Sequence, residues 1–248
     1  MITLKSKEEI EIMRSAGQIV AGALAMVGEE IKEGMSTKLL DKLVEDYIRS
    51  KDSIPAFKGY HGFPASACIS INEEVVHGIP GDRVIRDGDI VSVDVGSILD
   101  GYYGDSAKTF AIGNISEEKR KLMEITEKSL LAGIDKARNG NKLGQISAAV
   151  QKVAEDEGYG VVRQLVGHGI GRNMHEEPQV PNYGSVNEGP VLKTGMVIAI
   201  EPMVNCGTYQ VKTLPDGWTI VTSDGLPSAH FEHTVAITDN GPDILTVL

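Results

Sequence analysis

The sequence is poor in cysteine and in aromatic residues, and it has no excess of basic charge. Its 248 residues include only two cysteines, Cys68 and Cys206, which excludes a dense disulfide framework and is typical of a reducing compartment. The formal net charge of −11 argues against a nucleic-acid partner held by a broad basic face. It also gives no reason to expect an anionic membrane as a partner. These features favour a cytoplasmic enzyme or binding protein.

Long apolar segments and several common catalytic motifs are also absent. The first nine residues, MITLKSKEE, lack the apolar core of a signal peptide, and no apolar run approaches the ~20 residues needed to cross a bilayer. There is no Gly-x-Ser-x-Gly elbow, no Walker loop and no His-Glu-x-x-His helix. Any chemistry must therefore come from another arrangement of residues.

Helical and strand patterns follow one another twice along the chain. Ser6 and Glu9 form a capping-box pair, and apolar spacing predicts one helix that ends before Glu33 and a second that begins at Ser36. After Ser116 the spacing predicts helices over 117–137 and about 143–155, with a glycine break at 139–141. Apolar runs predict strands at 67–71, 90–95, 105–112, 160–166, 196–200 and 233–237.

The two halves also repeat short motifs. The run 76–79 (VHGI) corresponds to 167–170 (GHGI), and the run ending at Asp94 corresponds to the run ending at Glu201. More loosely, Asp105 and Glu232 each begin an apolar strand-like run. We therefore expect one α+β domain over 1–248, built from halves at about 5–113 and 114–248 that are related by a pseudo-twofold axis.

Such an axis would bring four acids together with one histidine: Asp94, Asp105, His168, Glu201 and Glu232. Converging carboxylates repel and resist ionisation, so these acids either lie apart at exposed strand ends or are neutralised by cations. For a single acid the exposed position is the commoner outcome. In the repeat, however, acids occupy equivalent positions in the two halves, and so do histidines, which favours a metal site. Oxygen donors with one imidazole and no thiolate suit two divalent ions of manganese, iron(II), cobalt or zinc.

Two further histidines, His77 and His175, lie close to these motifs in the sequence. They are either structural or donors of hydrogen bonds to charge that develops on a substrate. A few scarce apolar residues also lie near the motifs, and they form either core or a pocket for one medium-sized apolar side chain. These residues are Tyr60, Phe63, Cys68, Met174 and Trp218.

Taken together, six motifs resemble those of the type I methionine aminopeptidases, in their short bacterial form. They are VHGIP at 76–80, VDVG at 93–96, GYYGD at 101–105, HGIGRNMHEEP at 168–178, IEPM at 200–203 and FEHT at 231–234. The resemblance runs from about residue 3 to the C-terminus and implies the pita-bread metallopeptidase fold. In that fold, each pseudo-twofold half packs two helices on a shared, curved and mainly antiparallel sheet.

The resemblance implies removal of the N-terminal methionine from nascent proteins and peptides when the second residue is small. Asp94 would bind one metal ion, His168 and Glu201 the other, and Asp105 and Glu232 would bridge both. A metal-bridged hydroxide would attack the scissile carbonyl, and Glu201 would accept its proton.

The remaining residues take substrate-binding roles by the same resemblance. His175 would polarise the carbonyl, and His77 would contact the scissile amide nitrogen. The apolar set, Tyr60, Phe63, Cys68, Met174 and Trp218, would bind the methionine side chain, although the family often has tyrosine at position 63 and phenylalanine at 174. The resemblance also implies a cytoplasmic monomer that meets nascent chains, with the ribosome as a candidate partner. The alternatives are a prolidase or aminopeptidase P of the same fold, or a metal-free binding protein.

Overall fold

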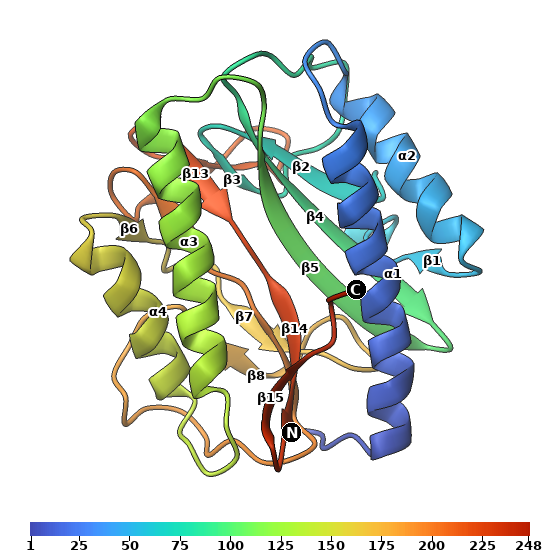
Figure 1. Cartoon of the computed structure of the whole chain (residues 1–248), viewed down its shortest axis with the longest axis vertical. Helices are drawn as coiled ribbons and strands as arrows, with labels where there is room; N and C mark the ends of the chain where they lie inside the picture. Colours follow the sequence, from blue (N-terminus) through green and yellow to red (C-terminus); the bar gives the residue numbers. More distant parts are fainter.

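Four helices cover one side of a curved set of strands (Figure 1). The structure, a computed structural model, describes all 248 residues, and every strand pair in it is antiparallel. The helices are α1 (Lys7–Glu30), α2 (Thr37–Ser50), α3 (Glu117–Lys136) and α4 (Gly144–Asp156), with a 3₁₀ turn, η1 (Tyr60–Gly62). The strands are β1 (Ile54–Pro55), β2 (Ala67–Ile71), β3 (Glu74–Val76), β4 (Ile90–Leu99), β5 (Tyr102–Ala111), β6 (Gly160–Val161), β7 (Gly167–Gly169), β8 (Glu176–Val180), β9 (Val197–Ile200), β10 (Met203–Asn205), β11 (Val211–Thr213), β12 (Ile220–Thr222), β13 (Ser228–His230), β14 (His233–Thr238) and β15 (Gly241–Ile244).

The helices begin where capping residues predict. The Ser6 hydroxyl accepts a hydrogen bond from the Glu9 backbone N–H, and the Glu9 carboxylate accepts one from the Ser6 N–H, which completes the capping box of α1. Ser36 and Ser116 cap α2 and α3 in the same way, by accepting from a backbone N–H three residues on. All four predicted helices are confirmed.

The predicted strand at 160–166 is wrong beyond Val161. Strand β6 ends there because Arg163 and Gln164 turn outward to solvent, and the guanidinium of Arg163 lies 4.3 Å from the ring centre of Tyr209. The apolar Leu165 is only partly buried, so the run lacks the regular burial of a strand. Strand β5, in contrast, begins earlier than predicted, at Tyr102 instead of residue 105.

Two sheets meet where β5 lies beside β14. One contains β1, β2, β4 and β5, and the other has the order β15-β14-β9-β7-β8. Hydroxyl side chains join them: Thr234 accepts from the Asp105 N–H at 3.1 Å and donates to the Asp105 carbonyl at 2.7 Å. Ser106 donates to the Glu232 carbonyl at 2.5 Å, and the Glu232 N–H donates to the Ala107 carbonyl at 2.9 Å. We call this junction the seam.

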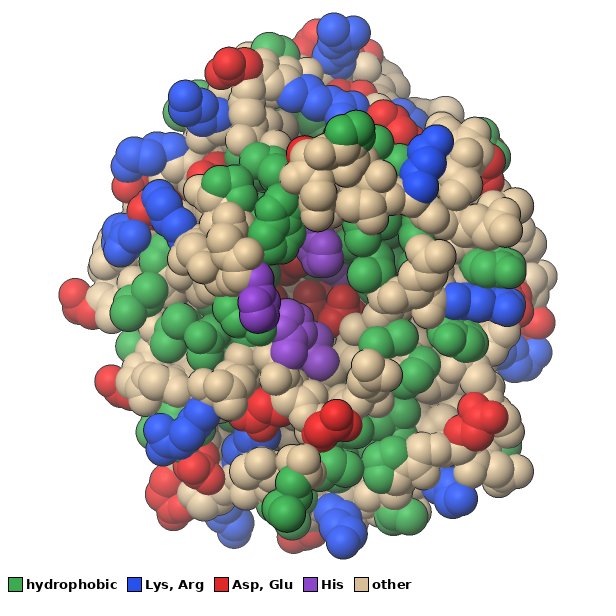
Figure 2. Space-filling view, turned by 180° about the vertical axis from the view of Figure 1, so that it is seen from behind, with side chains coloured by type: hydrophobic (Ala, Val, Ile, Leu, Met, Phe, Trp, Pro, Cys, Tyr) green, Lys and Arg blue, Asp and Glu red, His purple; other side chains and the backbone are tan.

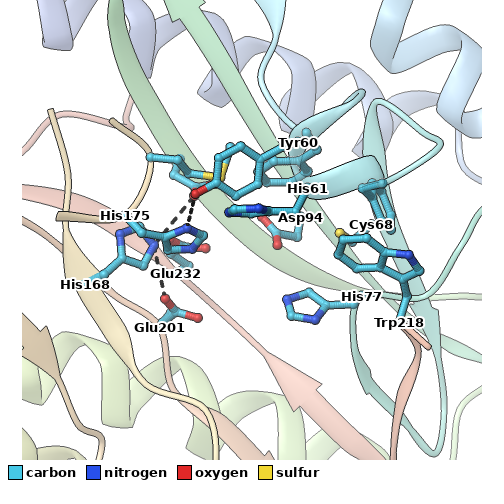
Figure 3. Close-up of a pocket in the computed structure, with 14 residues that line it drawn as sticks. Tyr60, His61, Cys68, His77, Asp94, His168, His175, Glu201, Trp218 and Glu232 are labelled. Atoms are coloured by element: carbon cyan, nitrogen blue, oxygen red, sulfur yellow. Dashed lines mark hydrogen bonds and ion pairs between the residues drawn. The ribbon is translucent and has the colours of Figure 1, made fainter. Parts of the chain in front are cut away.

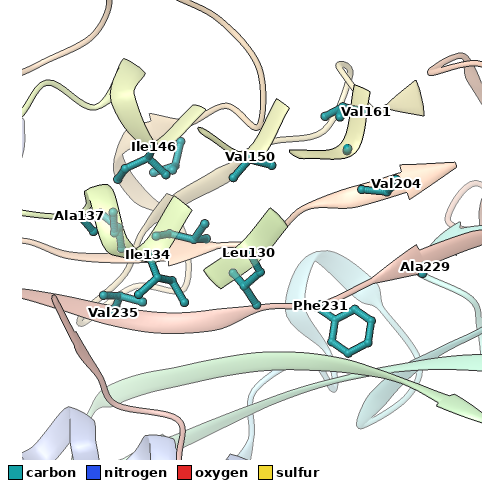
Figure 4. Close-up of a cluster of buried hydrophobic side chains, with 14 of the residues drawn as sticks. Leu130, Ile134, Ala137, Ile146, Val150, Val161, Val204, Ala229, Phe231 and Val235 are labelled. Carbon is teal, nitrogen blue, oxygen red and sulfur yellow. The ribbon is translucent and has the colours of Figure 1, made fainter. Parts of the chain in front are cut away.

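Each pair of helices buries its apolar face on its own part of the strands. One cluster joins α1 and α2 to β2 and β4, and a second joins α3 and α4 to β9, β10 and β14 (Figure 4). Leu130 and Ile134 of α3 pack there beside Ile146 and Val150 of α4. The helices therefore cover one face of the strands and leave the opposite face to form the site.

By length and composition alone, α1 could cross a membrane, which differs from the expectation that no segment approaches that length. In the structure, however, Met13, Val20, Leu24 and Val27 of this helix are buried. A core helix meets the same criteria, so one such helix says little about a membrane span.

Helix α1 approaches β5 so closely that only glycine fits between them. A Cβ atom on Gly104 would lie 2.7 Å from the Gly17 backbone nitrogen and 2.8 Å from the Ala16 carbonyl carbon. Both contacts are with backbone, so the helix itself would have to move.

We expect Gly104→Ala to lower the free energy of unfolding by about 1–3 kcal/mol, measured by urea denaturation. Gly81→Ala, where a Cβ meets nothing within 4 Å, serves as the control and should change it by less than about 0.5 kcal/mol. Equal effects would contradict the close approach.

Candidate metal centre and active site

Five side chains with metal-binding groups come from both sheets and line one cavity (Figure 3). Asp94 lies on β4 and Asp105 on β5, while His168 lies on β7. Glu201 directly follows β9, and Glu232 directly precedes β14. The structure thus brings together all the residues that the sequence analysis named as ligands. Seen from the side opposite the helices, histidines surround a hollow with acidic side chains at its floor (Figure 2).

The glycine-containing stretch 167–178 consists of two strands joined by a short connection. His168 lies within β7, and β8 begins at Glu176, with Gly169 opposite Glu176 in the pairing. Only 170–175 connects the two strands. His168 is therefore fixed by a strand, whereas Met174 and His175 lie at the end of a tight connection.

His168 presents one ring nitrogen to the acids. Its Nδ1 lies 2.9 Å from the Gly169 carbonyl oxygen, which can only accept, so Nδ1 carries the proton. The Nε2 lone pair then faces Glu201 Oε1 at 3.5 Å and Asp105 Oδ2 at 4.0 Å. Burial, with a smaller effect of His175, lowers the pKa of His168 to about 4. The neutral imidazole with a free Nε2 is the form that binds metals.

Asp105 and Glu232 are buried, Asp94 and Glu201 are half-buried, and none of the four carboxyl groups has a lysine or arginine partner. Burial is the main cause that raises the pKa of Asp94 to about 7 and the pKa values of Asp105, Glu201 and Glu232 well above their ordinary range. Neighbouring carboxylates add to the effect on the last three, and no lysine or arginine lines the cavity.

These acids also have unused hydrogen-bonding capacity. One buried oxygen each of Asp94, Asp105 and Glu232 has no hydrogen-bond partner. Ligand atoms of Asp105, His168 and Glu232 all lie within 4.8 Å of one another, and Asp94 and Glu201 line the same cavity. Unpaired buried acceptors beside a neutral imidazole fit a divalent cation of intermediate hardness.

The other side of the cavity is apolar and contains all five predicted pocket residues: Tyr60, Phe63, Cys68, Met174 and Trp218. The rings of Phe63 and Trp218 meet edge to face with centroids 5.1 Å apart. Burial raises the pKa of the Cys68 thiol well above its usual value, so the side chain stays protonated and apolar. The cavity volume of about 180 Å³ leaves room for one side chain beside the acids.

His77 and His175 lie on different walls of this cavity (Figure 3). Nδ1 of His175 is 2.7 Å from the Tyr60 hydroxyl, and its ring meets the His168 ring at 4.3 Å between centroids. His77 has a φ of 59°, in the left-handed region that residues other than glycine rarely adopt. Burial lowers the pKa of both histidines, so both are neutral at pH 7.

Three residues at the site were missed by the sequence analysis. Phe57 and His61 line the cavity, and Nε2 of His230 lies 4.0 Å from Glu201 Oε2 with no hydrogen-bond partner. Burial lowers the pKa of His230 to about 3. His61 could have been found from its place beside Tyr60, and His230 from its place directly before the motif FEHT at 231–234.

Comparison with known proteins agrees with this geometry. The model of "Metallopeptidase family M24" matches residues 11–239. The chain belongs to metallopeptidase family M24. Among curated M24 relatives, methionine aminopeptidase 1 of Bacillus subtilis is 55% identical over 246 residues and 99% of each chain. The methionine aminopeptidase of Clostridium acetobutylicum is 58% identical over 248 residues, which are 100% of this chain and 99% of that protein.

Solved structures of M24 relatives confirm the α+β pita-bread fold. The methionine aminopeptidase of Rickettsia prowazekii has a TM-score of 0.98 at 41% identity, with 100% of both chains covered. The prolidase of Pyrococcus furiosus has a TM-score of 0.79 at 27% identity, and the match covers 99% of this chain but 65% of that one. Membership of M24 implies use of a divalent metal, and the unpaired carboxylate oxygens of the cavity fit such an ion.

A buried ion pair fixes the connection that carries His175. The ammonium of Lys5 lies 2.6 Å from Glu176 Oε2, and the two side chains are only 4% and 13% exposed. Oε1 of the same carboxylate accepts from the Asn173 backbone N–H at 3.2 Å. A residue near the N-terminus thereby holds a strand end 171 positions away.

Lys5→Met should leave the Glu176 carboxylate buried and unpaired. We expect the free energy of unfolding to fall by about 3 kcal/mol, measured by chemical denaturation. Lys42→Met is the matched control, because the ion pair of Lys42 with Asp46 is exposed and should contribute less than about 1 kcal/mol. If both variants lost the same stability, the buried pair would not be what holds this connection.

Proposed function

We propose that this chain is a metalloaminopeptidase that removes the N-terminal methionine from nascent proteins and peptides when the second residue is small. The observation that carries the proposal is the meeting, in one cavity, of unpaired buried carboxylates, a neutral histidine and a closed apolar wall. Similarity over nearly the whole chain to proteins named methionine aminopeptidase supports the choice of substrate.

We assign the metal ligands as follows. Asp94 would hold one divalent cation, His168 and Glu201 a second, and Asp105 and Glu232 would be shared between them. The donor set, oxygens with one imidazole nitrogen and no thiolate, suits cobalt, manganese, iron(II) or zinc. When bound, the two ions would supply Lewis acidity and a water molecule whose pKa is lowered toward neutrality.

The protein's own groups would position the substrate and move its protons. Glu201 would accept the proton that the attacking water loses, since its carboxylate lines the cavity. Neutral His175 would donate a hydrogen bond to the scissile carbonyl, where negative charge develops, and His77 would contact the scissile amide nitrogen. The wall formed by Phe63, Trp218 and their neighbours would bind the methionine side chain and exclude water from it.

A proline-directed peptidase of the same fold is the nearest alternative. The likeness to the Pyrococcus furiosus prolidase, at 27% identity, is much weaker than the 55–58% identity to methionine aminopeptidases. We further propose a cytoplasmic monomer that meets nascent chains, with the ribosome as a candidate partner, and both free cysteines are in keeping with a reducing compartment.

Asp105→Ala should abolish methionine release. Loss of groups that merely support a metal ligand commonly costs 10–100-fold, so loss of a shared ligand should lower kcat/KM by at least about 100-fold. The measurement is release of methionine from Met-Ala-Ser at saturating metal, together with calorimetric titration of the metal. Asp156→Ala, an exposed carboxylate paired only with Lys152, is the control and should retain activity. Substantial activity in metal-loaded Asp105→Ala would contradict the shared-ligand assignment.

The small-second-residue rule gives a separate test. We expect Met-Ala-Ser to be cleaved and Met-Lys-Ser to be left intact, because the cavity has room for one side chain beside the acids. Chromatographic separation of the products gives both rates under the same conditions. Equal rates on the two peptides would refute this specificity while leaving the aminopeptidase activity itself in place.

A further inference from the structure

The Tyr60 hydroxyl makes a single hydrogen bond, to Nδ1 of His175 at 2.7 Å (Figure 3). The phenol is held in place by the tight turn around η1, where the Tyr60 N–H donates to the Phe57 carbonyl and the Phe63 N–H donates to the Tyr60 carbonyl, both at 2.9 Å. Gly59 makes the turn possible with a φ of 85°, which suits glycine. The hydroxyl is therefore aimed at one ring nitrogen by the backbone around it.

The direction of this hydrogen bond follows from acidity. A neutral imidazole has one N–H donor and one acceptor nitrogen, and a phenol can do either. The phenol O–H is a far stronger acid than the N–H of a neutral imidazole, so the stronger bond has the phenol donating and Nδ1 accepting. If Nδ1 donated instead, the Tyr60 proton would have no protein partner. Nε2 of His175 consequently carries the ring proton.

We propose that Tyr60 is a positioning residue whose hydroxyl fixes the tautomer of His175, so that Nε2–H is the donor offered to the substrate carbonyl. The donation from Nε2–H to the substrate carbonyl rests on the proposed function, whereas the tautomer of His175 does not. A role in the methionine pocket requires only the ring of Tyr60, so the hydroxyl is left for this second purpose.

The neighbouring His168 has its ring proton on the other nitrogen. The Gly169 carbonyl keeps the proton of His168 on Nδ1 and leaves Nε2 as an acceptor facing Glu201 and Asp105. Two rings whose centroids are 4.3 Å apart thus have opposite tautomers, each fixed by one hydrogen bond. One presents a lone pair to the acidic floor, and the other presents an N–H to the open cavity.

Nitrogen-15 NMR of the histidine rings in the metal-free protein tests the tautomer directly. The chain has six histidines, and His175→Gln identifies the signals of His175 by their loss. We expect wild-type His175 to show a protonated Nε2 and an unprotonated Nδ1. Tyr60→Phe, which removes one oxygen atom, should move both shifts toward the average of a tautomer mixture. Tyr103→Phe is the matched control, since Tyr103 packs in the same cluster without a hydrogen bond to His175, and it should leave the shifts unchanged.

Kinetics provide the second measurement. Loss of a positioned donor should lower kcat on Met-Ala-Ser about tenfold in Tyr60→Phe, with KM within about twofold because the ring remains. A wild-type His175 protonated on Nδ1, or a Tyr60→Phe variant with unchanged ring shifts, would overturn the proposal. A rise in KM with kcat unchanged would also overturn it, since that is the effect of pocket packing alone. If the wild type released no methionine, the proposed function would fail, while the NMR shifts would still decide the tautomer.

Discussion

Four carboxyl groups that are buried or half-buried without a lysine or arginine partner are the constraint on which the rest of this structure depends. Two carboxylates about 4 Å apart at an effective dielectric constant of about 20 repel by roughly 4 kcal/mol. A few such pairs would equal the entire stability of an ordinary domain, about 5–15 kcal/mol. Burial is the main cause that raises the pKa values of the four groups, and repulsion from neighbouring carboxylates adds to it for Asp105, Glu201 and Glu232. The fold tolerates the cluster because two extensive helix-covered cores lie on either side of it.

The seam explains how acids from two sheets are held so near one another. Thr234 binds both backbone groups of Asp105, and Ser106 binds the Glu232 carbonyl, so hydroxyls supply much of the contact between β5 and β14. These bonds use the backbone of the two acids and leave their carboxylate oxygens free, as the unpaired atoms of Asp105 and Glu232 show. The same hydrogen bonds that join the sheets therefore also keep acceptors available for a cation.

Local signals were enough to predict the helices, because capping depends on residues three positions apart, such as Ser6 and Glu9. The repeat was enough to bring the acids together, because equivalent strands carry Asp94 and precede Glu201. Contacts between distant parts of the chain were not predictable in this way. Nothing in the sequence pairs Lys5 with Glu176, which lie 171 positions apart. The prediction of a strand over 160–166 was wrong beyond Val161, because an apolar run does not show where the chain turns outward to solvent.

Helix α2, although it contributes no side chain to the cavity, controls the segment that carries Tyr60. Asp41 accepts hydrogen bonds from the backbone N–H groups of residues 66 and 67, and Glu45 pairs with Lys58 at 2.7 Å. The hydrogen bond from Lys58 is the main cause that lowers the pKa of Glu45 to about 2. Since this pKa is lowered on folding, the stabilising effect is complete above the ordinary value of 4.5 and is lost as the pH falls toward 2. The segment is therefore held throughout the neutral range, and the direction of the Tyr60 hydroxyl depends on a helix that faces away from the chemistry.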